Sequence, residues 1–221
     1  MTRLIVLDCD GTLVDSQHLI VDAMNATFEG QGLMPPSAEA VRHVVGLSLA
    51  EAIARLVPGI RQDACALLVD GYKQSFQALR LEAHFHEPLF EGVSETLREL
   101  ERRGHLLAIA TGKSDRGLAS VLATHGLEGI FASLQTADRH PSKPHPGMIE
   151  AAMRETGATA DETMMVGDTS YDIEMARAAR VHAVGVAWGY HPVAVLEQAG
   201  ADVVIDRFEQ LLALASGEAV L

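Results

Sequence analysis

The stretch LIVLDCDGTLVDS, residues 4–16, predicts a β-strand that ends in two closely spaced negative charges. Its apolar run ends in two carboxylates, Asp8 and Asp10, which are separated only by Cys9. Side chains alternate along a strand with a period of two, so both carboxylates are predicted to point the same way and Cys9 into the interior. Two negative charges about 4 Å apart repel by about 4 kcal/mol at an effective dielectric constant of roughly 20. A positive group is therefore needed nearby to offset this repulsion.

The composition is typical of a folded globular chain. Of its 221 residues, 48% are hydrophobic and 21% are charged, and the formal net charge is −13. The length suits one or two domains with a substantial core. The negative charge argues against a nucleic-acid partner, because no basic stripe could displace phosphate counterions. An anionic substrate must be attracted by a local positive site or a metal ion.

The sequence predicts a cytoplasmic protein with no membrane partner. Its two cysteines, Cys9 and Cys65, do not make a disulfide framework. The N-terminal apolar run is far too short for a signal peptide, and no segment approaches the ~18 to 20 apolar residues of a membrane span.

Short apolar runs recur along the chain, and helical patterns separate most of them. The pattern at 93–104, for example, places Val93 and Leu97 on one face. Alternating strand and helix signals predict a doubly wound α/β fold with a mainly parallel sheet. The predicted strands are residues 4–8, 106–111, 130–136, 163–168, 181–187 and 201–206.

Residues 16–82 break this alternation, because they contain helical patterns but no convincing strand. Ser48 and Glu51 fit a capping box at the start of one of these helices. A segment of roughly 65 residues is long enough for a small domain. We therefore predict an α/β core formed by residues 1–15 and 83–221, with a helical insertion at 16–82.

Polar residues gather where the predicted strands end. In open parallel sheets, ligands bind beyond the carboxyl ends of the strands, so these residues are predicted to share one site. Clustered carboxylates without a matching set of His or Cys ligands suit a hard cation such as Mg²⁺, which would offset the repulsion between Asp8 and Asp10. The candidate site residues are Asp8, Asp10, Thr111, Gly112, Lys143, Asp168 and Asp172.

Four motifs within this set resemble those of the haloacid dehalogenase-like (HAD) hydrolases. They are DCDGT (8–12), TGK (111–113), Lys143 in SKP, and GDTSYD (167–172), in the family's order. The stretches ATGKS, SKPHP and MVGDTSYDIEMARAA, with the insertion after the first motif, are similar to the phosphoglycolate phosphatase-like branch. The resemblance implies a HAD-like Rossmann-type core with a helical cap at 16–82.

The resemblance also implies roles for the acidic residues. Asp8 would be the nucleophile that becomes an aspartyl phosphate. Asp10 would protonate the leaving alcohol and then deprotonate the attacking water. Asp168 would bind Mg²⁺ together with the carboxylate of Asp8 and the main-chain carbonyl of Asp10. Asp172 would support this metal site.

Three further residues, Thr111, Gly112 (through its amide) and Lys143, would hold the phosphoryl oxygens. An anionic nucleophile must approach a phosphate dianion, so Mg²⁺ and Lys143 are needed to offset the repulsion. The predicted function is a Mg²⁺-dependent phosphatase for a small phosphorylated metabolite, acting as a monomer or homodimer. By the resemblance, phosphoglycolate is the first candidate substrate, followed by pyrophosphate and sugar phosphates.

Two other functions stay open on the sequence. A phosphomutase similar to β-phosphoglucomutase would return the phosphoryl group to a sugar phosphate and would need a cap that excludes water. A non-enzymatic phospho-receiver module also gathers acids, a threonine and a lysine on a parallel sheet. The nucleophile in the first strand and the large insertion argue against the receiver.

Several residues have both a functional and an ordinary structural interpretation. Arg42 and His43 could contact the leaving group or lie on ordinary cap surface. His84 and His86 imitate the spacing of metal ligands, but we expect a hinge or surface role for them. His145 is expected to have a structural or supporting role rather than a catalytic one.

Overall fold

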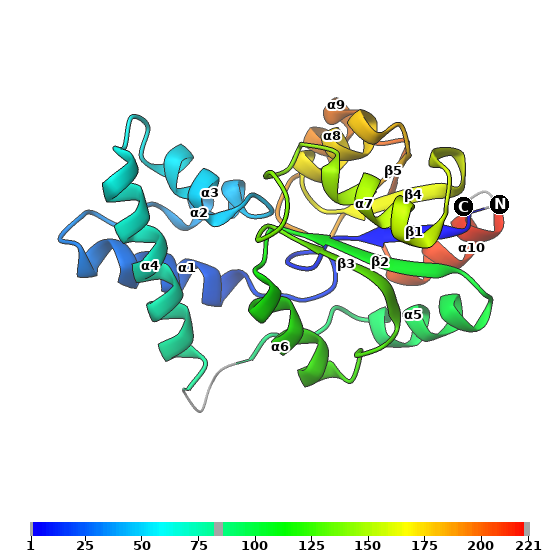
Figure 1. Cartoon of the computed structure of the whole chain (residues 1–221), viewed down its shortest axis with the longest axis horizontal. Helices are drawn as coiled ribbons and strands as arrows, with labels where there is room; N and C mark the ends of the chain where they lie inside the picture. Colours follow the sequence, from blue (N-terminus) through cyan, green and yellow to red (C-terminus); the bar gives the residue numbers. More distant parts are fainter. Residues whose placement is uncertain (1, 82–85, 219–221) are drawn as a thin grey trace.

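A parallel sheet forms the centre of the structure, a computed structural model that describes residues 2–81 and 86–218. Its strands are β1 (Leu4–Leu7), β2 (Leu106–Thr111), β3 (Phe131–Thr136), β4 (Thr163–Gly167), β5 (His182–Val186) and β6 (Val203–Ile205). They pair in parallel in the order β3-β2-β1-β4-β5-β6 (Figure 1). The first strand of the sequence therefore lies in the middle of the sheet, between β2 and β4.

Helices cover both faces of the sheet, and β1 shows the alternation between them. Ile5 and Leu7 belong to one buried cluster, whereas Leu4 and Val6 belong to the other. The first cluster is completed by α5 (Val93–Arg102), α6 (Asp115–His125), η2 (Phe208–Gln210) and α10 (Leu211–Ser216). The second is completed by α7 (Gly147–Thr156), η1 (Ala160–Glu162), α8 (Ser170–Ala179) and α9 (Val193–Ala199). This three-layer arrangement confirms the predicted doubly wound fold.

The last two strands are shorter than the apolar runs predicted. β5 begins after Val181, whose amide donates to Ala176 O at 3.0 Å and so completes the end of α8. β6 begins after Ala201, whose amide donates in the same way to Leu196 O of α9 at 3.0 Å. The first apolar residues of these runs therefore close helices instead of extending strands.

Helices α1 to α4 lie between β1 and β2 in the chain and are called here the four-helix segment (residues 17–79). They are α1 (Gln17–Gly30), α2 (Ala38–Val44), α3 (Leu49–Leu56) and α4 (Gln62–Leu79). They share their own buried cluster, which includes Met24, Phe28 and Ile53. Figure 1 shows the segment beyond the carboxyl ends of the strands. The predicted boundary between residues 82 and 83 lies outside the described residues, so the division into core and cap stays a prediction.

The capping box predicted at Ser48 and Glu51 does not form. Ser48 does precede α3, but its side chain makes no capping hydrogen bond. Its amide donates instead to Ser142 Oγ at 2.8 Å, and the Glu51 carboxylate accepts from Arg55 Nε at 3.1 Å. Both residues of the predicted box therefore make other hydrogen bonds, and the start of α3 is hydrogen-bonded to the loop before Lys143.

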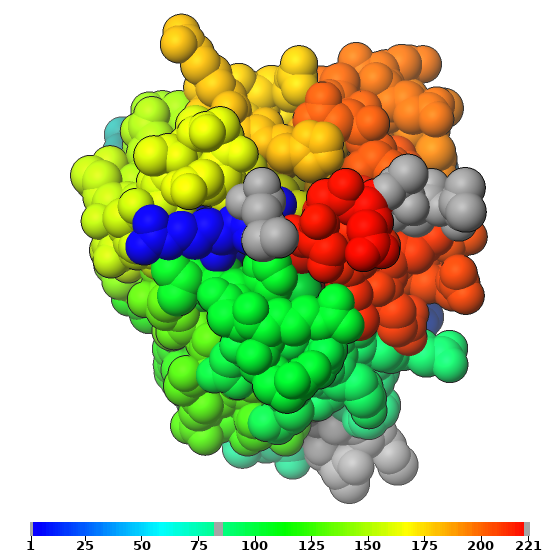
Figure 2. Space-filling view, turned by 90° about the vertical axis from the view of Figure 1, so that its right-hand side faces the viewer, coloured from blue at the N-terminus to red at the C-terminus, as the bar shows by residue number. Residues whose placement is uncertain are grey.

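Figure 2 looks onto the opposite end of the core, where the amino ends of the strands lie. The blue N-terminal residues run across this surface between the green and the yellow segments. Arg3 links these neighbours, because its amide donates to Glu162 O and its carbonyl accepts from the Leu106 amide, each at 2.8 Å. No helix in the described part of the chain combines the length and the apolar character needed to cross a membrane.

Candidate active site

The predicted site residues meet at the carboxyl ends of β1, β2 and β4. β1 passes directly into Asp8, whose amide still donates to Val166 O of β4 at 3.0 Å. Thr111 is the last residue of β2, and Asp168 follows the last residue of β4. Neighbouring parallel strands thus carry these side chains to one edge of the sheet. The buried members of the set are Asp8, Asp10, Thr111, Lys143, Asp168 and Asp172.

Three buried carboxylates lie together around Lys143. Asp8, Asp168 and Asp172 each offer an oxygen, and these oxygens lie within 4.8 Å of one another. Lys143 Nζ lies 2.8 Å from Asp8 Oδ1 and 2.7 Å from Asp172 Oδ1. One positive charge thus faces three acidic groups, which leaves an excess of negative charge when the acids are ionised.

Hydrogen bonds are distributed unequally among these three acids. Asp168 accepts from Thr12 Oγ1 at 3.0 Å and from a backbone amide at 2.9 Å. Asp172 accepts from the amide and the hydroxyl of Thr169 at 3.1 and 2.7 Å. Asp8 accepts from no hydroxyl or backbone amide of a described residue: Oδ1 has only the Lys143 ammonium, and Oδ2 has no hydrogen-bond donor. A buried carboxylate oxygen without a donor is costly, so Asp8 is the member that needs a further partner.

The titration of the cluster reflects this shortage of positive charge. Burial raises the pKa of Asp8 to about 7; Lys143 opposes the rise and Asp172 adds to it. Burial also raises the pKa of Asp168, and the charges of Asp172 and Asp8 raise it further. Burial alone would lower the pKa of Lys143, but Asp172 and Asp8 outweigh it and raise that pKa. The lysine is therefore held as a cation, while protons compete for the carboxylates of Asp8 and Asp168.

The donor set fits a hard divalent cation. Mg²⁺ prefers oxygen ligands and is commonly bound through one or two carboxylates. Asp8 and Asp168 supply carboxylate oxygens close together, and Asp8 Oδ2 lacks a hydrogen-bond donor among the described residues. The identity of the ion and the predicted use of the Asp10 carbonyl stay predictions.

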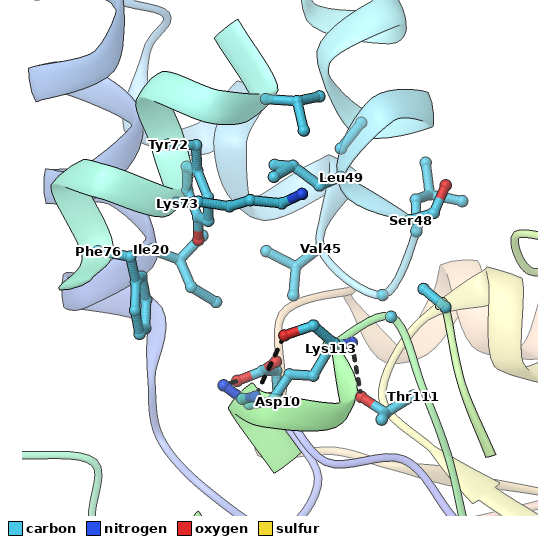
Figure 3. A pocket seen from close by; sticks show the side chains of 18 of the residues that line it. Asp10, Ile20, Val45, Ser48, Leu49, Tyr72, Lys73, Phe76, Thr111 and Lys113 are labelled. Carbon is cyan, nitrogen blue, oxygen red and sulfur yellow. Dashed lines mark hydrogen bonds and ion pairs between the residues drawn. The ribbon is translucent and has the colours of Figure 1, made fainter. Parts of the chain in front are cut away.

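The Asp10 carboxylate has a lysine of its own. Lys113 Nζ lies 2.9 Å from Asp10 Oδ1, and the hydroxyl of Ser16 donates to the same oxygen. Figure 3 shows Asp10 and Lys113 side by side at one side of a cavity. The repulsion between the two neighbouring carboxylates is therefore offset by two lysines, the buried Lys143 bound to Asp8 and the half-buried Lys113 bound to Asp10.

Lys113 also binds Glu87, with 3.1 Å between the amine and Glu87 Oε1. Burial alone would lower the pKa of Lys113, but Asp10 and Glu87 outweigh it and raise that pKa. Glu87 lies in the connection that returns from the four-helix segment, and Ser16 in the connection that leads into it. Both connections thus contact the partners of Asp10. Lys113 stands inside the TGK motif, which is a usable signal, whereas no sequence pattern marks Glu87.

Two motif glycines are required by close approaches. Gly11 has a φ of +84°, and a Cβ there would lie 2.2 Å from Asp168 Oδ2. A Cβ at Gly112 would lie 2.5 Å from Leu47 O, in the connection between α2 and α3. Gly11 therefore lets the first and last motifs meet, and Gly112 lets the four-helix segment contact the end of β2.

A cavity of about 480 Å³ lies between the strand ends and the four-helix segment (Figure 3). Its core side is lined by Asp8, Asp10, Thr111, Gly112 and Lys113. Lys143, Asp168 and Asp172 are buried and are not among the described residues that line it. Because the amine of Lys143 is engaged by two acids, its predicted contact with a phosphoryl group stays a prediction.

The expected contact of Arg42 and His43 with a leaving group is not supported. Neither residue is among the described residues that line the cavity. The His43 ring stacks on His191, with 4.9 Å between ring centroids, and the His43 carbonyl accepts from Tyr171 Oη at 3.0 Å. His43 therefore joins the end of α2 to the core beside α8.

The other histidines have the structural roles expected, as far as they are described. His145 Nδ1 accepts from the Gly147 amide at 3.1 Å at the start of α7. His86 is exposed, which agrees with a surface role. His84 lies outside the described residues. Cys9 is fully buried in the core, as the strand alternation predicts.

Comparison with known proteins identifies the family. A family model described as haloacid dehalogenase-like hydrolase matches residues 5–186. The chain belongs to the haloacid dehalogenase-like hydrolase family, and the predicted class of enzyme is confirmed.

Individual relatives match over nearly the whole chain. The probable phosphatase IndB of Dickeya dadantii is 34% identical, over 97% of this chain and 94% of that protein. A phosphoglycolate phosphatase of Aliivibrio fischeri is 30% identical, over 97% and 96%. In structure, the chain is similar to a predicted phosphoglycolate phosphatase of Haemophilus somnus, with a TM-score of 0.85, 24% identity and coverage of 96% and 97%. The resemblance to the phosphoglycolate phosphatase-like branch is thus confirmed.

Replacing Asp8 by Asn is expected to stabilise the chelator-treated protein more at high pH than at low pH. The folded-state pKa is raised from 3.8 to about 7, so the folded wild type binds more protons than the unfolded chain within that window. The free energy of unfolding of the wild type therefore falls as the pH rises through it, and the amide removes this loss. In urea unfolding, the free energy of unfolding of the variant minus that of the wild type should increase by at least about 1 kcal/mol from about pH 5 to pH 8.

The matched control for this prediction is Asp70→Asn, since Asp70 is an exposed acid on α4. Its stability relative to the wild type should hardly change with pH. If Asp8→Asn changes the free energy of unfolding equally at all pH values, or destabilises the protein more as the pH rises, the pKa of Asp8 is not raised by burial.

Proposed function

We propose that this chain is a Mg²⁺-dependent phosphatase that hydrolyses a small phosphorylated metabolite through a phosphoryl group carried on Asp8. The observation that carries the proposal is the state of Asp8. Its carboxylate lines the cavity and is buried, with Oδ1 paired to Lys143 and Oδ2 accepting no hydrogen bond from a described residue. The Oδ2 atom is suited to attack, because no donor has to be displaced from it first.

The Asp8 carboxylate would attack phosphorus, and the bond from phosphorus to the substrate oxygen would break. Asp10 would give its proton to the departing alcohol and then take a proton from the water that attacks the phosphorylated Asp8. This second step releases inorganic phosphate and returns Asp8 to its free form. Lys113 and Ser16 would position the Asp10 carboxylate through the contacts described above.

Asp8, Asp168 and the carbonyl of Asp10 would hold Mg²⁺, with Asp172 in support. When bound, the ion would polarise the phosphoryl oxygens and offset their charge. Thr111 and the amide of Gly112, which line the cavity, are placed to hold phosphoryl oxygens. Lys143 would also hold a phosphoryl oxygen, since it is a buried cation 2.8 Å from Asp8 Oδ1.

Phosphoglycolate is the first candidate substrate, because curated relatives carry the name phosphoglycolate phosphatase. Pyrophosphate and sugar phosphates follow, and a phosphomutase activity is the competing reaction on the same site. In this proposal the four-helix segment acts as the cap. A cytoplasmic location and a monomeric or homodimeric state belong to the same proposal.

Turnover is expected to depend on Mg²⁺ and on Asp8. Phosphate release from a panel of phosphorylated metabolites should stop in excess chelator and return when Mg²⁺ is added. Asp8→Asn should lower kcat by roughly 10³-fold or more, because the neutral amide cannot form the covalent intermediate. Asp70→Asn is the control. Full turnover in chelator, or by Asp8→Asn, would contradict the proposal, and isomerised sugar phosphate without phosphate release would favour the phosphomutase.

Lys113→Met is expected to lower kcat more than it changes KM. The loss should approach roughly 10²-fold, the lower part of the range for acid–base assistance, since the variant leaves Asp10 without its cation. Lys113→Arg keeps the charge and should recover much of kcat, which separates positioning from general loss of folding. Steady-state kinetics with circular dichroism measures both. A change confined to KM would show that Lys113 acts in substrate binding instead.

A further inference from the structure

The side of the cavity that faces the four-helix segment is mostly apolar. Its apolar and aromatic lining side chains include Ile20, Val45, Leu49, Val69, Tyr72 and Phe76. Figure 3 shows Val45 and Leu49 across the cavity from Asp10, whereas the Phe76 ring lies beside Lys113, with 5.6 Å between its centroid and Nζ. A molecule whose phosphoryl group lies at Asp8 would therefore place its leaving group against apolar surface.

Lys73 is one of the polar residues on this side of the cavity, together with Ser48, Gln77 and Arg80. It extends from α4 into the cavity, on the side away from Asp10 (Figure 3). No ion pair or hydrogen bond joins Lys73 to another described residue, whereas Lys113 has two acidic partners. In a chain with a net charge of −13, an unpaired ammonium group inside a cavity is a specific point of attraction for an anion.

The cavity is large for a two-carbon leaving group. Its volume of about 480 Å³ corresponds to roughly 16 water molecules at about 30 Å³ each. The glycolate part of phosphoglycolate would carry an anion to Lys73 but would leave most of the apolar wall in contact with water. A sugar phosphate would place several hydroxyl groups against a wall that offers few hydrogen-bonding side chains, among them Ser48 and Gln77.

We propose that this site selects phosphomonoesters whose leaving group joins an apolar body to a second anionic group, with Lys73 as the residue that binds this second anion. The inference rests on the proposed function, which sets the phosphoryl group at Asp8. The apolar body would displace water from the wall formed by the four-helix segment. The second anion would then lie on the far side of the cavity from the acid cluster, where repulsion from those carboxylates is weakest.

Four phosphomonoesters separate the effect of the apolar body from that of the second anionic group. Ethyl phosphate has neither, phosphoglycolate has only the second anion, benzyl phosphate has only the apolar body, and para-carboxybenzyl phosphate has both. All four release an alcohol rather than a phenol, which keeps their intrinsic reactivity comparable. We expect kcat/KM to be highest for para-carboxybenzyl phosphate, by about tenfold or more over each singly featured probe, and lowest for ethyl phosphate.

Variants of Lys73 test its assignment. Lys73→Met should lower kcat/KM about tenfold for the two carboxylate-bearing probes and leave the other two within about twofold. Lys73→Arg should retain the preference for a carboxylate. Lys73 is exposed, so both variants are expected to fold. Arg116→Met is the comparison, because Arg116 is another cation that lines the cavity, from α6 rather than from the four-helix segment.

Three results would overturn the inference. They are a preference for phosphoglycolate or ethyl phosphate over the benzyl probes, an equal loss on all four probes in Lys73→Met, and a carboxylate-selective loss in Arg116→Met but not in Lys73→Met. Isothermal titration calorimetry of the four probes with Asp8→Asn in Mg²⁺ measures affinity without turnover. If affinity follows the order expected above but the wild type hydrolyses none of the probes, the binding site is supported and the phosphatase proposal is rejected. If the wild type hydrolyses the probes with a different order of kcat/KM, the binding site alone is rejected.

Discussion

The burial of Asp8 with Lys143 as its single polar partner among the described residues is the constraint on which the rest of the site depends. The central position of β1 forces this burial, because β2 and β4 flank the strand and helices cover both of its faces. The fold supplies one cation, Lys143, but also adds two further acids, Asp168 and Asp172. The cluster is thus short of positive charge, and this shortage is what suits it to a divalent cation.

The second lysine gives the neighbouring acid a different environment. Lys113 and Ser16 hold the Asp10 carboxylate, while the acids around Asp8 share Lys143. Two carboxylates separated by one residue therefore have different partners, which lets them take different chemical roles. The partners of Asp10 lie on the connections to the four-helix segment, so the element that forms the apolar wall also contributes to the position of the proposed acid and base.

The sequence predicted the parts of this arrangement that follow from local patterns. The apolar runs located the strands, and the residues at their ends located Asp8, Thr111 and Asp168, because strand ends in a parallel sheet share an edge. The Lys113–Glu87 pair could not be predicted, since Glu87 lies in a connection without periodicity and meets Lys113 only through the tertiary fold. Arg42 and His43 were chosen from their place in the chain, but the rotation of α2 that turns His43 toward His191 is set by packing.

The measurement that tests this account most directly is the location of the phosphoryl group during turnover. Wild-type protein with Mg²⁺ and its best substrate, stopped in acid within the first turnover and digested, should yield the peptide containing Asp8 with the added mass of one phosphoryl group. Fragmentation should place that mass on Asp8 itself, and the phosphorylated peptide should disappear once the substrate is consumed. A phosphoryl group on another residue, or rapid turnover with no phosphorylated peptide at any time, would contradict the account.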